Sequence, residues 1–111
     1  MAPKVAKFTL TRAKAKERVR ALSEKSARTA KLIWTEHIQQ RMETRGIDSD
    51  AVLRILRQGD IDDDPSEGEN PGDWKIKLVL KLPTGRVAGV VAVITRNDCL
   101  VLITAEWEDH Q

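Results

Sequence analysis

The sequence predicts one small α+β domain in which N-terminal helices pack on one face of a small antiparallel β-meander. Three observations support this prediction. The first half of the chain contains segments with helical spacing of apolar residues, and the second half contains segments of apolar and polar alternation. Turns containing Gly or Pro separate these segments. With 111 residues, 41% of them apolar, the chain has room for one hydrophobic core.

A basic helix is expected near the N-terminus. Residues 11–30 contain strong helix formers and neither Gly nor Pro. Their apolar stripe at Ala15, Val19 and Leu22 is thin, so this helix requires a partner surface in the same chain or in another molecule. We therefore divide the chain into a basic helical extension, residues 1–30, and a domain, residues 31–109.

A short strand and two helices are expected next. Residues 31–34 are apolar and partly β-branched, which suits a first strand. Thr35 is a good N-cap for a helix over residues 36–45 that stops at Gly46. A further helix follows, capped by Asp48 or Ser49 and ended by Gly59. Its apolar face consists of Ala51, Val52, Ile55 and Leu56.

The second half begins with an acidic loop and continues as a meander. Residues 60–73 contain seven carboxylates, two prolines and no basic residue, which predicts a solvated, mobile loop. Beyond it, residues 74–82 alternate with period two and predict a strand. A turn at Pro83–Arg86 leads into residues 87–95, which are apolar on both faces, as is typical of a central strand. After a turn at residues 96–98 a last strand ends at Trp107.

The net charge of +2 conceals an asymmetry. Residues 1–31 carry ten basic and two acidic side chains, whereas residues 32–111 carry nine basic and fifteen acidic ones. Arg12, Lys16 and Arg20 recur every fourth residue along one face of the basic helix. We consider three readings: an arm that binds the phosphates of RNA, a solvated helix, and a homo-oligomer in which this helix docks on the acidic loop of a second copy.

Composition excludes several classes of protein. No apolar run approaches the roughly 20 residues that cross a bilayer, and the N-terminus lacks the apolar stretch of a signal peptide. The single Cys99 excludes an internal disulfide and lies in an apolar run, so we expect a cytoplasmic protein. The acidic run 60–64 is followed by Pro65 where a calcium loop requires Gly. With one cysteine and two histidines, we expect no metal and no cofactor.

The candidate chemistry lies on the helix over residues 36–45. His37, Arg41 and Arg45 are spaced at i, i+4 and i+8 and share one face, while Ile38 and Met42 face the core. One imidazole and two guanidiniums can hold a phosphodiester, because Arg presents a planar fork that matches phosphate oxygens. The alternative is that the arginines pair with nearby carboxylates while His37 caps and packs.

The same segment resembles a widespread bacterial domain family catalogued as of unknown function, with the pattern T-x-H-x3-R-M-x2-R-G-[IV]. The matching residues are Thr35-Glu36-His37, Arg41-Met42, Arg45-Gly46-Ile47, Val52, Leu56 and Gly59. The resemblance covers residues 31–107 and leaves out residues 1–30. It implies the fold of RelE-type toxins and of barnase/colicin/EndoU-like ribonucleases.

The resemblance implies toxin-like, metal-independent cleavage of RNA by transesterification, in which the ribose 2′-OH attacks the adjacent phosphorus. It further implies RNA as a partner, in the context of the ribosome, and a cognate antitoxin protein. His37, Arg41 and Arg45 carry over as catalytic residues, with Thr104 from the last strand. Glu106 stands where an aromatic hydroxyl is common, and the chain has no tyrosine.

Two hypotheses follow from this departure. Either Thr104 or Glu106 supplies the proton transfer, or the chain is a non-catalytic RNA- or protein-binding module of the same fold. In both hypotheses we expect Arg12, Lys16 and Arg20 of the basic N-terminal helix to contact nucleic acid. We expect the same of Lys75 and Lys77 on the first strand of the meander.

Overall fold

The computed structural model describes residues 9–25 and 31–109. Three helices and six strands occur in these ranges, which confirms the predicted α+β class. In chain order the elements are α1 (Arg12–Lys25), β1 (Leu32–Trp34), α2 (Glu36–Arg45), α3 (Ser49–Gln58), β2 (Asp60–Ile61), β3 (Ser66–Glu67), β4 (Trp74–Lys81), β5 (Val87–Ile94) and β6 (Leu100–Trp107). None of the described helices is long and apolar enough to cross a membrane.

The sheet is built around the antiparallel meander β4–β5–β6. Its strand order is β1-β6-β5-β4-β2, and β3 also pairs with β4. The hairpin between β4 and β5 turns at Gly85, whose φ of 91° is a left-handed conformation that Gly adopts without steric cost. Strand β1 pairs with the beginning of β6 in parallel, with Leu32 opposite Leu100. A parallel neighbour was not predicted, because a strand of three residues carries no sequence signal for its partner.

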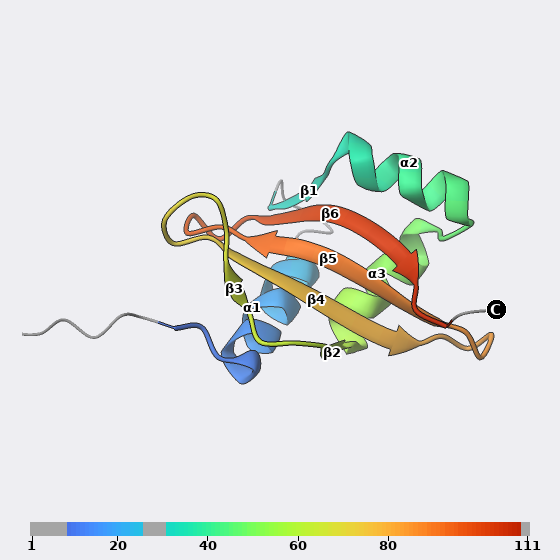
Figure 1. Cartoon of the computed structure of the whole chain (residues 1–111), viewed down its shortest axis with the longest axis horizontal. Coiled ribbons are helices and arrows are strands. Elements are labelled where there is room, and N and C mark those ends of the chain that lie inside the picture. The colour runs from blue at the N-terminus through green and yellow to red at the C-terminus, as the bar shows by residue number, and fades with distance from the viewer. Residues whose placement is uncertain (1–8, 26–30, 110–111) are drawn as a thin grey trace, which may run out of the picture.

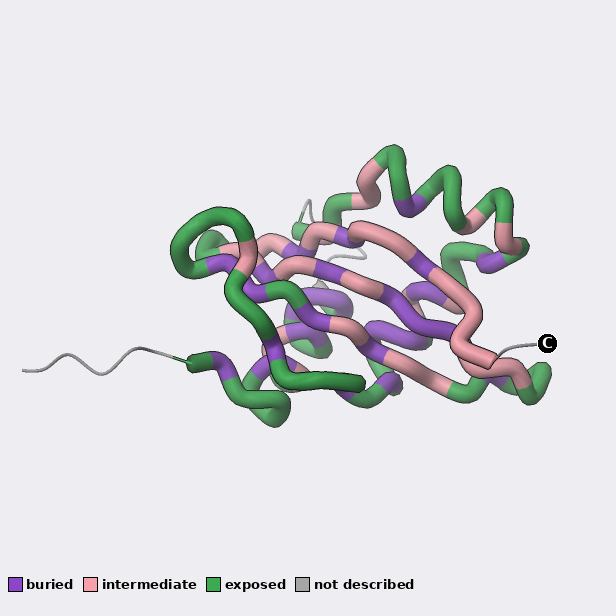
Figure 2. The backbone as a smooth tube through the Cα atoms, in the orientation of Figure 1, coloured by how far each residue is buried: buried purple, intermediate pink, exposed green. Residues whose placement is uncertain are grey.

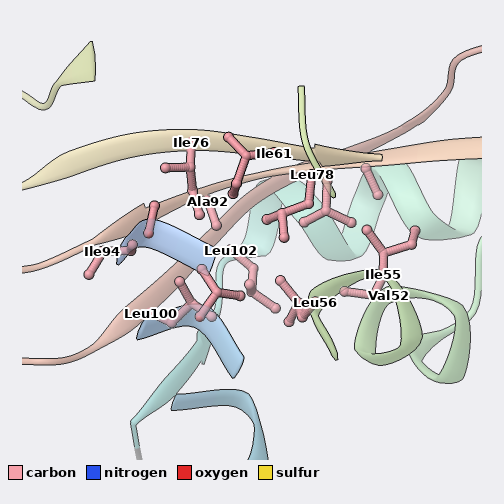
Figure 3. Close-up of a cluster of buried hydrophobic side chains, with 14 of the residues drawn as sticks. Val52, Ile55, Leu56, Ile61, Ile76, Leu78, Ala92, Ile94, Leu100 and Leu102 are labelled. Atoms are coloured by element: carbon pink, nitrogen blue, oxygen red, sulfur yellow. The ribbon is translucent and has the colours of Figure 1, made fainter. Parts of the chain in front are cut away.

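Helices α1 and α3 cover one face of the sheet, behind the strands in the view of Figure 1. The core lies between them and the sheet (Figure 3). Its largest fully buried side chains are Ile38, Ile55, Leu56, Leu78, Ile94, Leu100, Leu102, Val19, Val52 and Val90. The alternate residues of β4, β5 and β6 point away from this core. We refer to the side of the sheet that they form, turned toward the viewer in Figure 1, as the open face.

Helix α2 lies along the edge of β6 rather than over the sheet (Figure 1). The Thr35 hydroxyl donates to the carbonyl of Leu102 at 2.6 Å, and the Arg45 guanidinium donates to the carbonyl of Ala105 at 2.7 Å. The indole of Trp107 donates to the backbone carbonyl of Arg45 at 2.7 Å. The side chains of Thr35 and Arg45 therefore satisfy carbonyls of β6 at the last residue that pairs with β1 and beyond it.

The prediction of a solvated loop over residues 60–73 is wrong in its details. The segment contributes β2 and β3 to the sheet, and Ile61 is buried. Asp73 is also buried, and its carboxylate accepts hydrogen bonds from the backbone N–H of Arg96 at 3.1 Å and from Asn70 at 3.4 Å. The acidic composition obscured these contacts, because it predicts solvation from the average of the segment and not from individual positions.

The basic helix shares the core of the domain. Ala15 and Val19 are fully buried, Leu10 and Leu22 are nearly so, and all four belong to the same cluster as the sheet residues. The partner surface that the thin apolar stripe requires is therefore supplied by the same chain. The structure describes this helix from Arg12 to Lys25, and the predicted extension to residue 30 lies outside the described residues, as do residues 1–8.

We predict that Val19→Ala lowers the free energy of unfolding by about 1–3 kcal/mol, because it removes buried methyl groups and leaves a cavity between α1 and the sheet. Urea unfolding monitored by tryptophan fluorescence measures this. Lys14→Ala, on the exposed side of the same helix, is the control and should change the free energy by less than about 0.5 kcal/mol. Equal, small effects of both variants would show that α1 does not belong to the core.

Candidate functional site

The two ends of α2 are fixed by the residues that the sequence pattern predicted. The Thr35 side chain accepts a hydrogen bond from the N–H of Ile38 at 3.2 Å and caps the N-terminus. Gly46, with φ 67°, ends the helix in the left-handed conformation, and its N–H donates to the carbonyl of Met42. Ile38 is fully buried, which sets the rotation of the helix and leaves His37 and Arg41 exposed to solvent.

His37 and Arg41 lie against each other on this exposed side. The Nε of Arg41 donates to Nε2 of His37 at 3.5 Å, at the long end of the range for a hydrogen bond. An imidazole beside a guanidinium combines a group that can accept a proton with a group that binds phosphate. The structure thus brings together two of the three predicted helix residues.

Arg45 makes a different contact. Its guanidinium binds the carbonyl of Ala105 on β6, and the side chain is half-buried against the strand. The Trp107 indole binds the backbone of the same residue. Arg45 therefore joins α2 to β6, and its predicted catalytic role stays a prediction.

Thr104 and Glu106 lie on the open face. In the register of β5 and β6, Thr104 is opposite Val91 and Glu106 is opposite Gly89. Residues directly opposite each other share a face, and the fully buried Val90 between them points into the core. Within the described residues, no hydrogen bond or ion pair joins these two side chains to His37 or Arg41. Their roles as catalytic residues also stay predictions.

Lys77 lies at the centre of an acidic cluster on the open face. Its ammonium contacts Glu108, lies 3.5 Å from Glu106 and lies 3.9 Å from Asp62. The hydrogen bond to Glu108 is the main cause that raises the pKa of Lys77 above that of an ordinary lysine. Gly89 lies beneath the cluster, where a Cβ would come within 3.2 Å of Glu108. Lys77, predicted to bind nucleic acid, is thus engaged by carboxylates of its own chain, whereas Lys75 on the same strand is exposed.

The predicted RNA-binding stripe of α1 also contacts groups of its own chain. The Nε of Arg12 donates to Asp64 at 2.7 Å, and Lys16 forms an ion pair with Asp60. The hydrogen bond from Lys16 lowers the pKa of Asp60. Arg20 donates to a backbone carbonyl, that of Arg57, at 3.1 Å. The parts of opposite charge therefore meet within one chain, and the predicted contacts to RNA or to a second copy stay predictions.

Sequence reasoning did not identify the acidic partners of Lys77. Period-two alternation shows that Lys77 points away from the core, but the identity of its cross-strand neighbours depends on register. Glu108 lies beyond the end of β6, and Asp62 follows β2, a strand that was not predicted. No local sequence pattern indicated that Asp62, Glu106 and Glu108 all lie next to Lys77.

Comparison with known families places the chain. Residues 34–107 match the model of the family described as domain of unknown function DUF4258. The chain belongs to this family. The match begins one residue before the Thr35 cap and ends at the last residue of β6, so it contains both α2 and the meander. No curated protein and no solved structure matches the chain.

We predict that Lys77→Met lowers the free energy of unfolding by about 1 kcal/mol near neutral pH, because three carboxylates lose their shared cation. The pKa of Lys77 is raised in the folded state, so its stabilisation is complete below pH 10.5 and is lost as the pH rises through the folded pKa. The difference between wild type and variant should therefore narrow in strong alkali. Urea unfolding across pH measures this.

Lys75→Met is the matched control, since it removes the same charge from the same strand and the same face. It should leave the stability near neutral pH almost unchanged. If Lys75→Met destabilises the domain as much as Lys77→Met does, the acidic cluster contributes nothing specific.

Proposed function

We propose that the chain is a toxin-like, metal-independent endoribonuclease of the DUF4258 family. The observation that supports this best is the His37–Arg41 pair, an imidazole and a guanidinium 3.5 Å apart on the exposed side of α2. RNA can be cleaved without a metal when a base deprotonates the ribose 2′-OH and cations stabilise the phosphorane. The pair supplies one group for each requirement.

In the proposed reaction His37 accepts the proton of the 2′-OH while the 2′-oxygen bonds to the adjacent phosphorus. The bond from phosphorus to the 5′-oxygen breaks, which leaves a 2′,3′-cyclic phosphate and a free 5′-hydroxyl. Arg41 binds the non-bridging oxygens, whose negative charge increases in the transition state. The leaving 5′-oxygen takes up a proton from water, and the proton that His37 accepted passes to the solvent. Because Glu106 is an acceptor in its ion pair with Lys77, we assign the contact with this oxygen to Thr104.

The remaining parts of the proposal follow the family resemblance. RNA is the substrate, in the context of the ribosome, and the compartment is the cytoplasm. A cognate antitoxin neutralises the activity. Each part depends on the cleavage reaction itself, so the reaction is the one to test first.

We predict that induction of the wild-type chain arrests growth and produces RNA fragments ending in 2′,3′-cyclic phosphate. His37→Ala should reduce cleavage by about 100-fold or more, the usual contribution of a general base. Arg41→Ala should reduce it as well, through lost stabilisation of the phosphorane. Growth curves and end-group analysis of RNA incubated with purified protein, with and without ribosomes, measure both effects.

Two control variants separate chemistry from fold and charge. Gln40→Ala changes an exposed residue of the same helix, and Arg54→Ala removes an exposed arginine from α3. Both should cleave RNA like the wild type. A wild-type chain that leaves growth and RNA unaffected, with or without ribosomes, would overturn the proposal.

A second candidate function is a non-catalytic RNA-binding module, and the acidic cluster favours it. Glu106 occupies the position of the expected aromatic hydroxyl and is engaged by Lys77, so the last strand offers no obvious acid. In this case RNA competes with Asp63 and Asp64 for Arg12 of α1. The contact between α1 and the acidic segment then limits RNA binding.

This function predicts that RNA retention increases when Asp63→Asn and Asp64→Asn are combined, because Arg12 is released. Neutralising Arg12, Lys16 and Arg20 together should abolish retention. Filter binding of a single-stranded RNA at low and high ionic strength measures both. The double variant Glu43→Gln and Asp50→Asn removes the same amount of negative charge away from Arg12. It should increase RNA retention less than the double variant of Asp63 and Asp64 does. Absence of retention at low salt would exclude the module.

A further inference from the structure

The open face of the sheet contains an apolar row that crosses three strands. The register places Lys75 opposite Val93, Val93 opposite Val101, and Val101 opposite Ile33 of β1. The three apolar residues therefore lie side by side across β5, β6 and β1. Neither α1 nor α3 covers them, because both helices pack on the other face (Figure 1).

The apolar row is only partly buried. Ile33 is 42% exposed, the one large hydrophobic residue classed as exposed in the described part of the chain. Val93 and Val101 are half-buried, and Figure 2 shows the strands of this face alternating between buried and intermediate. An antiparallel sheet with one solvated face normally carries polar residues there. Contiguous apolar residues on an uncovered face of a sheet indicate a surface that binds another molecule.

The row forms the floor of a groove. A hollow of about 630 Å³ is lined by Val93, Val101 and Ile103 on the sheet and by residues 67–70 and Asp73 of the neighbouring segment. A second hollow of about 510 Å³ adjoins it, shares Asp73 with the first, and reaches Ile33. Together the two hollows run from β3 to the edge strand.

The wall of the groove is held in place by hydrogen bonds. The N–H of Gly68 donates to the carbonyl of Asp73 at 2.7 Å, and the N–H of Asp73 donates to the carbonyl of Asn70 at 3.1 Å. The carboxylate of Asp73 accepts from the N–H of Arg96 at 3.1 Å, which joins the wall to the turn between β5 and β6. The groove is thus formed before any partner binds.

The charge of the wall restricts the occupant. The first hollow is lined by three carboxylates, those of Glu67, Glu69 and Asp73, and by one ammonium, that of Lys75, so its lining has a net negative charge. Arg96 lines the second hollow, and Asp62, Asp63 and Asp64 continue the acidic edge beyond the first. A nucleic acid would bring phosphates against these carboxylates. A second copy that docked face to face would bring the same acidic wall against this one. The complementary occupant carries apolar side chains flanked by lysine or arginine.

The backbone of the sheet restricts the conformation of the occupant. Beneath Val93 and Val101 the floor offers no free backbone groups to an added strand, because β5 is paired with β4 and β6, and the first residues of β6 are paired with β5 and β1. A helix satisfies its own backbone hydrogen bonds and needs only an apolar surface. We propose that this groove binds a basic amphipathic helix of another protein. The proposal does not depend on the ribonuclease activity.

A designed peptide tests the proposal. The probe is a fluorescein-labelled helical peptide with leucine at i, i+3, i+4 and i+7 and lysine elsewhere, and its counterpart replaces lysine by glutamate. We expect the full chain to bind the leucine/lysine peptide in a fluorescence anisotropy titration and to bind the leucine/glutamate peptide at least about tenfold more weakly. Equal binding of both peptides, or no binding, would overturn the proposal.

Variants locate the binding surface. Ile33→Asp in the floor and Glu69→Lys in the wall should each weaken binding about tenfold or more. Glu43→Lys makes the same change of charge on α2 and should bind like the wild type. All three positions are exposed, and urea unfolding verifies that each variant folds. If Glu43→Lys weakens binding as much as Glu69→Lys, the peptide senses net charge alone and the groove is not the site.

Light scattering tests the competing occupant. The unliganded chain should be a monomer at the concentrations of the titration. If it is a dimer that Ile33→Asp dissociates, a second copy fills the groove and the proposal is wrong.

Discussion

The edge of β6 is the constraint on which the rest of the structure depends. Strand β1 pairs only with the first residues of β6, Leu100 to Leu102. Beyond that point the strand would expose unpaired carbonyls, which invite other chains to pair with it. Helix α2 occupies this length instead, and it contributes the Thr35 hydroxyl and the Arg45 guanidinium to the carbonyls of Leu102 and Ala105. The motif that suggested chemistry therefore also contains the residues that close the sheet.

Because α2 both closes the edge of β6 and contains the candidate residues, these residues lie on different sides of the helix. A helix that seals a strand edge must turn one side toward the strand, and Ile38 and Arg45 are on that side. His37 and Arg41 then lie on the remaining, exposed side. Thr104 is on the strand itself, with its side chain on the open face, so the helix pair and the strand residue belong to different elements. Arg45 joins the two elements and so fixes their relative position.

Several parts of this arrangement were predictable from the sequence because they depend on local chemistry. Helix α2 begins after Thr35 and ends at Gly46, as predicted. Both ends were predictable because a side-chain acceptor caps a helix N-terminus and Gly adopts a left-handed conformation at little cost. The period-two pattern likewise predicted β4, and the run that is apolar on both faces predicted β5 as a central strand. Membership of an uncharacterised domain family also agrees with the resemblance seen in the motif.

Other parts were not predictable because they depend on contacts between distant residues. The parallel pairing of Ile33 with Val101 and the pairing of Asp60 with Val79 require the folded sheet. The ion pairs of Lys77 require the register of β6 against β5 and β4. The docking of α1 required knowledge of which surface would receive Val19. For residues 60–73 the acidic composition predicted a solvated loop, whereas one of its seven carboxylates, that of Asp73, is buried.

Chain continuity connects the groove with the helix pair. Ile33 is the exposed end of the apolar row, and His37 follows it by four residues. An extended chain spans at most about 3.5 Å per residue, so the two α-carbons are no more than about 14 Å apart. A helix is about 10 Å wide with its side chains. An occupant seated on Ile33 is therefore within reach of the N-terminus of α2, where RNA would meet His37. A protein partner and the proposed substrate would then compete for space, which would couple partner binding to activity without any conformational change.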